Sequence, residues 1–175
     1  MSLLLSIHPK NPQDRLIQEA AELVRQGAVI VFHTDSGYAL GCRLDDKQAT
    51  DRIRLIRQLP EKHHFTLMCR DLSEIATYAF VDNFTYRFLK AHTPGAYTFL
   101  LKATSEVPRR LQHPKRKTIG IRVPDCKIAL ELLKAIEEPL MSVSLILPDE
   151  TIPLHDPEEI HEKLDKIIDV IIDGG

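Results

Sequence analysis

The sequence lacks the signatures of several large classes of protein. No apolar run approaches the 18 or so residues that span a bilayer, so we expect no membrane helix. Cys42, Cys69 and Cys126 form no CxxC pair, which argues against a disulfide framework or a zinc site and favours buried thiols in a reducing compartment. Neither GxGxxG nor GxxxxGK[ST] occurs, so neither a Rossmann fingerprint nor a P-loop is supported.

Two further absences narrow the function. The eight histidines are scattered, so no Ser/His/Asp triad can be selected from the sequence. The short apolar N-terminus has no basic region and no cleavage site, and we interpret it as a first strand rather than a signal peptide. We therefore expect a cytoplasmic protein.

The composition is that of an ordinary globular protein. The chain has 175 residues, of which 43% are hydrophobic and 27% charged, and we expect one domain over residues 1–175. The net charge of −2 conceals an uneven distribution, because basic residues crowd 102–127 while the last third is acidic. Such asymmetry permits a local anion-binding face.

Hydrophobic periodicity predicts alternating helices and strands. The mixture favours an α/β fold, a single-domain twisted open mixed sheet with flanking helices. Asn11 is a plausible N-cap for the first helix, and Pro60 is expected to end the second. The predicted helices are 12–26, 46–58, 72–78, 83–92, 126–136 and 156–166; the predicted strands are 1–7, 28–32, 38–42, 66–69, 97–103, 118–123, 140–147 and 169–172.

The most function-like feature is a polar turn between two apolar strands. Thr34, Asp35, Ser36 and Gly37 follow a buried strand, and hydroxyls with free backbone N–H groups at a strand end suit a phosphate or an amino-acid head group. The alternative is a turn in which Asp35 and Ser36 bond the local backbone.

Three other segments carry candidate residues. The basic stretch with Arg109, Arg110, Lys115, Arg116 and Lys117 suits phosphate contacts, although a run of like charge is usually a solvated loop. This stretch lacks interleaved aromatic residues for base stacking.

The remaining candidates are an arginine, a histidine pair and two serines. Arg57 could meet an anion beyond a strand end, or could lie on the surface. His63 and His64 lack the spacing of a helical metal site, and we predict no metal ligands. Ser142 and Ser144 share one side of a strand and are either site hydroxyls or core hydroxyls bonded to backbone.

Taken together, these segments resemble the YrdC/YciO family of threonylcarbamoyl-adenylate synthase-like proteins, and the YciO branch most closely. The family carries Pro-Thr-Asp-Thr-x-Tyr-Gly-Leu, Lys-x-Arg-Pro, Pro-Gly-x-x-Thr, Gly-x-Arg-x-Pro and Ser-x-Ser-Ala-Asn in that order. The similar segments here run through almost the whole chain and are 33–40, 57–60, 94–98, 120–124 and 142–146.

The resemblance implies a concave, positively charged groove and the reactants ATP, L-threonine and bicarbonate, with Mg²⁺ arriving on ATP. The products in the synthases are threonylcarbamoyl-AMP and pyrophosphate, which feed a tRNA modification, and the family is also associated with double-stranded RNA and tRNA. The nucleotide- and threonine-binding residues implied here are Thr34, Ser36, Tyr38, Arg57, Thr98, Arg122, Ser142 and Ser144.

Departures from the family pattern leave alternatives open. Arg57 replaces the family lysine, His33 a proline, Leu59 an arginine and Ile146 an asparagine. The last two changes remove polar ligands for ATP, so the chain is either a synthase with weakened activity or a non-catalytic RNA-binding protein using the same groove. A third possibility is a groove for another small nucleotide or carbamoyl compound. Relatives continue with a strand pair beyond Gly175, which this chain is expected to lack.

Overall fold

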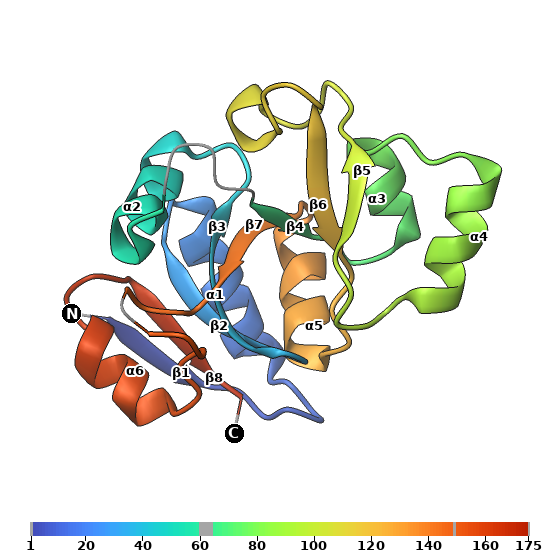
Figure 1. Ribbon diagram of the computed structural model, residues 1–175. Helices are drawn as coiled ribbons and strands as arrows, with labels where there is room; N and C mark the ends of the chain where they lie inside the picture. The colour runs from blue at the N-terminus through green and yellow to red at the C-terminus, as the bar shows by residue number, and fades with distance from the viewer. Residues whose placement is uncertain (1, 60–64, 149, 175) are drawn as a thin grey trace.

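An eight-stranded sheet runs through the computed structural model, which describes residues 2–59, 65–148 and 150–174 (Figure 1). The strands are β1 (Leu3–Ser6), β2 (Ile30–Thr34), β3 (Gly37–Arg43), β4 (Thr66–Met68), β5 (Phe99–Lys102), β6 (Thr118–Arg122), β7 (Leu140–Ser144) and β8 (Val170–Asp173). The helices are α1 (Asp14–Arg25), α2 (Lys47–Arg57), α3 (Leu72–Tyr78), α4 (Asn83–His92), α5 (Lys127–Ile136), α6 (Pro157–Leu164) and the short 3₁₀ helix η1 (Arg109–Leu111).

The sheet is open and mixed in direction, as predicted. Its order is β1-β8-β2-β3-β7-β4-β6-β5, so β1 and β5 are the two edges. β8 lies between β1 and β2 and is parallel to both, and β4 is parallel to β6. The other neighbours, β2–β3, β3–β7, β4–β7 and β5–β6, are antiparallel.

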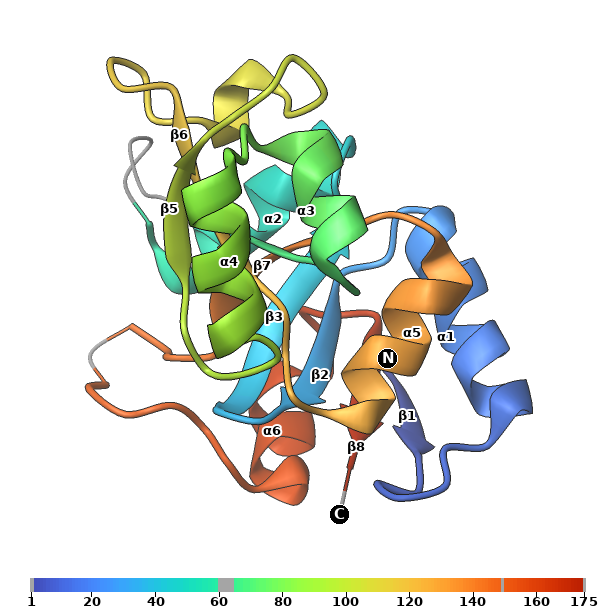
Figure 2. The same cartoon turned by 90° about the vertical axis from the view of Figure 1, so that its right-hand side faces the viewer.

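Each face of the sheet has its own apolar core. On one face α1 and α5 pack side by side (Figure 2) and cover Ile30 and Phe32 of β2 and Met68 of β4. The opposite core contains buried residues of α2, α3 and α6, such as Ile53. Strand side chains alternate between faces, so β2 contributes Val31 to this second core and its neighbours to the first.

Aspartates define where several helices begin. The carboxylates of Asp46, Asp71, Asp82 and Asp156 each accept a hydrogen bond from a backbone N–H of the first turn of α2, α3, α4 and α6. Each cap satisfies a donor that has no partner within the helix. The N-cap expected at Asn11 is wrong, because α1 begins two residues later than predicted, after Gln13.

The remaining bounds agree with the sequence prediction to within a few residues. α3 and α4 coincide with the predicted 72–78 and 83–92. The predicted helix end at Pro60 and the pair His63 and His64 lie outside the described residues.

Candidate functional site

The polar turn joins β2 to β3 at the end of the hairpin. The Thr34 hydroxyl donates to the Gly37 carbonyl at 2.6 Å and accepts the Ser36 N–H at 3.2 Å, while Gly37 has a φ of +111°. Glycine adopts such a φ at no steric cost. The local-backbone interpretation therefore holds for Thr34, whose hydroxyl is engaged within the turn.

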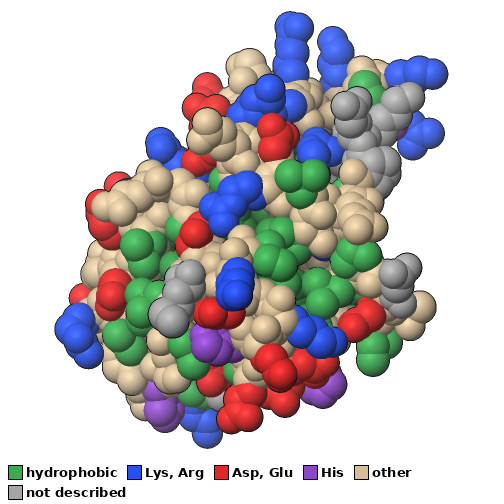
Figure 3. Space-filling model, turned by 90° about the vertical axis from the view of Figure 1, so that its left-hand side faces the viewer, with side chains coloured by type: hydrophobic (Ala, Val, Ile, Leu, Met, Phe, Trp, Pro, Cys, Tyr) green, Lys and Arg blue, Asp and Glu red, His purple; other side chains and the backbone are tan. Residues whose placement is uncertain are grey.

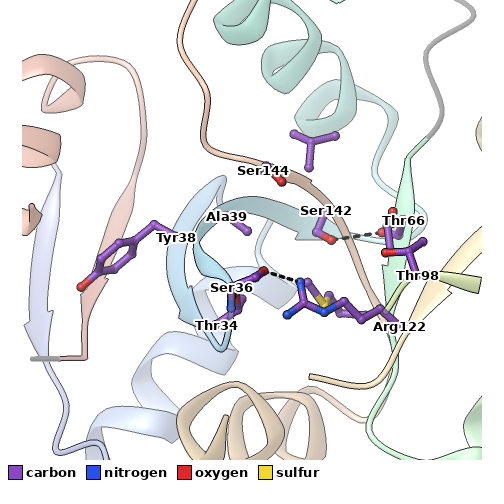
Figure 4. A pocket seen from close by; sticks show the side chains of 11 residues that line it. Thr34, Ser36, Tyr38, Ala39, Thr66, Thr98, Arg122, Ser142 and Ser144 are labelled. Atoms are coloured by element: carbon purple, nitrogen blue, oxygen red, sulfur yellow. Dashed lines mark hydrogen bonds between the residues drawn. The ribbon is translucent and has the colours of Figure 1, made fainter. Parts of the chain in front are cut away.

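Asp35 and Ser36 instead hold a distant arginine. The Asp35 carboxylate forms an ion pair with Arg122 of β6 and also accepts the Asp125 N–H at 3.0 Å. Arg122 Nη1 donates to Ser36 Oγ at 2.8 Å (Figure 4), and its Nε donates to the Gly95 carbonyl at 3.3 Å. Only 8% of the Arg122 side chain is exposed. The turn thus fixes a buried guanidinium whose three acceptors lie in two loops of the chain.

Beside this pair lies a small cavity of about 60 Å³. At about 10–15 Å³ for each water, it has room for roughly four to six water-sized groups. That volume suits the head group of an amino acid rather than a nucleotide. Its wall is rich in hydroxyls and is formed by Thr34, Ser36, Tyr38, Ala39, Thr66, Met68, Thr98, Arg122, Ser142, Val143 and Ser144.

Seven of the eight predicted binding residues line this one cavity, and Arg57 is the exception. Thr66 and Met68 also line it and were not predicted. Thr66 pairs with Ser142 of β7 and with Gly120 of β6, so strand pairing brings it into the wall. Thr66 is a polar residue at the start of an apolar strand, which could have marked it as a candidate. The position of β4 between β6 and β7, however, cannot be deduced from the sequence.

The two serines of β7 have different roles in the wall. The Ser142 hydroxyl is buried and donates to the Thr66 carbonyl at 3.2 Å. Ser144 is exposed at the open end of the strand, toward the middle of the view in Figure 4. Ser142 therefore braces β4 against β7, while Ser144 remains accessible to a ligand.

Tyr38 lines the cavity, but its ring and hydroxyl are directed away from the other polar residues of the wall. In Figure 4 the ring points away from Thr34, Ser36 and Arg122. The hydroxyl donates to Asp173 Oδ1 at 3.4 Å and accepts the Gly174 N–H at 3.4 Å. Burial, assisted by the negative charge of Asp173, raises the pKa of this hydroxyl above its ordinary value, although the Gly174 N–H opposes the shift.

Arg57 lies at the end of α2, beyond the cavity. Its Nε donates to the Ile146 carbonyl at 2.9 Å, two residues past Ser144, and burial lowers the pKa of its guanidinium. Leu59 has a structural role here, because its N–H bonds the Arg54 carbonyl at 3.0 Å after Gln58 in a left-handed conformation. Helices that end in this way often have an apolar residue just beyond the end that contacts the core. Leu59 is this residue for α2 and packs against the core.

The basic stretch projects from the end of the molecule that carries η1. His113 Nδ1 accepts the N–H groups of Lys115 and Arg116 at 3.2 and 3.0 Å, which shapes a tight, exposed turn. Figure 3 shows Lys and Arg side chains gathered at the top of the molecule, where η1 lies in Figure 1, and acidic ones toward the end that carries α6.

The five predicted RNA-binding residues are not equivalent. Arg109 and Lys117 line a hollow of about 530 Å³, which does not share lining residues with the first cavity. Arg110 instead turns inward and donates to the Leu44 carbonyl at 3.3 Å. Four of the five side chains are therefore exposed to a partner, and the charge of the groove as a whole stays a prediction.

The described residues contain neither a metal-binding cluster nor a membrane-spanning helix. Within residues 2–59, 65–148 and 150–174, no cluster of three or more His, Cys, Asp or Glu side chains could hold a metal ion. No helix in the same ranges is long and apolar enough to cross a membrane.

Comparison with known proteins relates the chain to one family. The Sua5/YciO/YrdC family model, described as "Telomere recombination", matches residues 22–175. The protein named "Uncharacterized protein YciO" of Escherichia coli K12 is 60% identical over all 175 residues, which correspond to 85% of its length. The crystal structure of E. coli YciO superposes with a TM-score of 0.96 over the same shares of the two chains.

More distant relatives carry functional names. A threonylcarbamoyl-AMP synthase of Vibrio vulnificus is 27% identical over 161 residues, 90% of this chain and 86% of the synthase. The structure of P. abyssi Sua5 complexed with L-threonine is 24% identical, with a TM-score of 0.90 over 99% of this chain and 51% of that one, and this likeness shows the fold alone. The match over most of the chain and the 60% identity to YciO show that the protein belongs to the Sua5/YciO/YrdC family and is a distant relative of the threonylcarbamoyl-AMP synthases.

Proposed function

We propose that the protein is a threonylcarbamoyl-adenylate synthase, with the hydroxyl-lined cavity as its amino-acid site. The observation that carries the proposal is the convergence of seven predicted residues, a buried arginine among them, around one cavity. Arg122 is held rigidly by Asp35 and Ser36, so it offers a fixed cation to a substrate carboxylate. The hydroxyls of Thr98 and Ser144 offer both donors and acceptors to an amine or a hydroxyl.

The reaction proposed follows from the three reactants. The amine of L-threonine forms a bond with the carbon of bicarbonate, the C–OH bond of bicarbonate breaks, and the hydroxide leaves with an amine proton as water, which gives a carbamate. A carbamate oxygen forms a bond with the α-phosphorus of ATP, and the bond from that phosphorus to the β-phosphate oxygen breaks, releasing pyrophosphate. The contribution expected of the protein is positioning of the reactants.

ATP requires more space than the cavity offers. With about 60 Å³ inside, the nucleotide would extend over the surface beyond Ser144, toward Arg57 at the Ile146 carbonyl. Mg²⁺ is proposed to arrive with the phosphates, held by their oxygens and by water, since the described residues offer no acidic cluster for it.

Pyrophosphate release tests this proposal. Purified protein with ATP, L-threonine and bicarbonate should release pyrophosphate, and omission of L-threonine should stop the release. Ser144→Ala should reduce kcat/KM about 2- to 10-fold, the value of one hydrogen bond. Ser73→Ala, an exposed serine of α3, serves as the matched control and should match the wild type. Absence of threonine-dependent release by the wild type would rule out the synthase.

A second candidate function is RNA binding without catalysis. The exposed basic turn at Lys115 and Arg116 favours it, as does Leu59, which is partly buried against the core where the family has an arginine. Mobility shifts of tRNA and duplex RNA over a salt series test this function, because phosphate contacts make affinity fall steeply with salt. Indifference to both RNAs at low salt would exclude it.

A further inference from the structure

Exposed aromatic side chains gather at one end of the molecule, on α4 and β5. Residues 80–99 hold six of the ten Phe and Tyr residues of the chain. Phe84 is 74% exposed and Tyr97 64%. α4 has Leu89 as its one fully buried residue, so most of its surface is open to a partner. We call this surface the α4–β5 face; its exposed apolar residues are Phe80, Phe84, Tyr86, Phe88, Tyr97 and Leu100.

The rings form an ordered array. Phe88 stacks on His92 with ring centroids 4.3 Å apart and meets Phe99 edge to face at 5.9 Å, while Tyr97 meets His92 edge to face at 6.2 Å. Phe84 lies one helical turn before Phe88 on the same side of α4. Figure 2 looks onto this side of the molecule, with α4 in front and β5 beside it. The array therefore presents flat surfaces at fixed positions.

A hollow of about 430 Å³ lies between the helix and the edge strand. Phe84 and Phe88 of α4 form one wall, and Phe99 and Leu100 are on the other. Thr98 lines both this hollow and the candidate active-site cavity, so the two are adjacent. A ligand on the α4–β5 face would thus come close to the cavity.

The charges of the same segment point to an anionic partner. Arg87, Lys90 and Lys102 are exposed. Asp82 is the single carboxylate between residues 80 and 103, and it is engaged as the N-cap of α4. This excess of positive charge is not complementary to a purely apolar protein partner.

Aromatic rings interleaved with basic side chains are the arrangement on which unpaired bases stack while the phosphates are neutralised. We propose that the α4–β5 face binds a single-stranded segment of RNA, whose bases stack on Phe84, Phe88 and Tyr97 and whose phosphates meet Arg87 and Lys90. The choice of RNA over DNA rests on the second candidate function, RNA binding. The hollow of this face shares no lining residue with the one that Arg109 and Lys117 line.

Fluorescence anisotropy with a labelled 12-nucleotide oligo-uridine tests this proposal. Phe84→Ala and Tyr97→Ala should each weaken binding by roughly 5- to 100-fold, the value of one stacked base. Leu55→Ala, which truncates an apolar side chain that is 79% exposed on α2, is the control and should bind as the wild type does. Lys90→Gln should lower the slope of log affinity against log salt by about 0.7, and Lys134→Gln on α5 should not.

The same variants separate this proposal from its competitors. Affinity that is unchanged in both aromatic variants would overturn it, as would tighter binding of oligo-thymidine than of oligo-uridine. If sedimentation velocity shows a dimer and Phe84→Ala makes the protein monomeric, the face instead joins two copies of the chain. Pyrophosphate release should be unaffected by Phe84→Ala, so failure of the synthase proposal and failure of this one produce different results.

Discussion

The ion pair between Asp35 and Arg122 allows a quantitative prediction. The two side chains are 15% and 8% exposed, and Arg122 has two other acceptors, Ser36 and the Gly95 carbonyl. Asp35→Ala would leave a buried guanidinium without its counter-charge. Removal of one partner of a buried pair typically costs about 3–5 kcal/mol. Because two hydrogen bonds of Arg122 persist, we expect the lower end, about 3 kcal/mol.

Urea unfolding measures this loss. With a slope of about 2 kcal/mol per molar urea, a loss of about 3 kcal/mol moves the midpoint down by about 1.5 M. The control is Glu138→Ala, which breaks the Arg43–Glu138 ion pair at 3.2 Å, whose side chains are more exposed. Exposed pairs contribute about 0–1 kcal/mol, so this midpoint should move by less than about 0.5 M.

A double variant distinguishes an uncompensated charge from a general packing defect. Asp35→Ala with Arg122→Leu removes both charges, and we expect it to be more stable than Asp35→Ala alone. If Asp35→Ala shifts the midpoint no further than Glu138→Ala does, the pair is not the buried anchor described above. The same holds if the double variant is less stable than the single one.

Three further predictions concern the cavity, the basic turn and a buried acid. A Cβ on Gly120 would lie 3.1 Å from Thr98 Cγ2 and 3.2 Å from Thr66 Oγ1, two residues that line the cavity. Gly120→Ala should therefore narrow the cavity and raise the KM for L-threonine in the pyrophosphate-release assay. An unchanged KM would show that the amino acid binds elsewhere. A triple variant of the basic turn should lower the slope of log affinity against log salt for duplex RNA by up to about 2.7, at about 0.9 for each phosphate contact. It combines Lys115→Ala, Arg116→Ala and Lys117→Gly, with glycine chosen at the last position because Lys117 has a φ of 56°. An unchanged slope would make the turn a solvated loop. Burial raises the pKa of Glu74 above its ordinary value of 4.5, so the folded state binds the proton more tightly than the unfolded state does. Stability should therefore fall as pH rises from about 4.5 through the folded pKa. Glu74→Gln should reduce this fall in urea titrations between pH 4.5 and 7, and an identical fall would show that Glu74 does not cause it.

Local signals predicted the elements well. Hydrophobic periodicity placed α3 and α4 at their observed bounds, and the structure adds that Asp71 and Asp82 cap them. The start of α1 was wrong because Pro12 looked like a first helical residue, whereas the first turn instead uses the Gln13 carbonyl as acceptor for the N–H groups of Leu16 and Ile17.

The part of the site that depends on contacts between residues far apart in the sequence could not be predicted. Asp35 and Arg122 are 87 residues apart, and the sequence suggested only local backbone contacts for Asp35. Thr66 joined the cavity through its register with Ser142, which also depends on the order of strands. The family pattern placed Arg57 at a phosphate, but whether it reaches one depends on a ligand that extends beyond Ser144 to the Ile146 carbonyl.

A crystal soaked with ATP and L-threonine tests the central claim most directly. The account predicts electron density for the amino acid in the cavity beside Thr34 and Ser144, with its carboxylate near Arg122 and the nucleotide outside, on the side of Arg57. An empty cavity with either ligand bound elsewhere, in crystals of a protein that releases pyrophosphate with threonine, would contradict it.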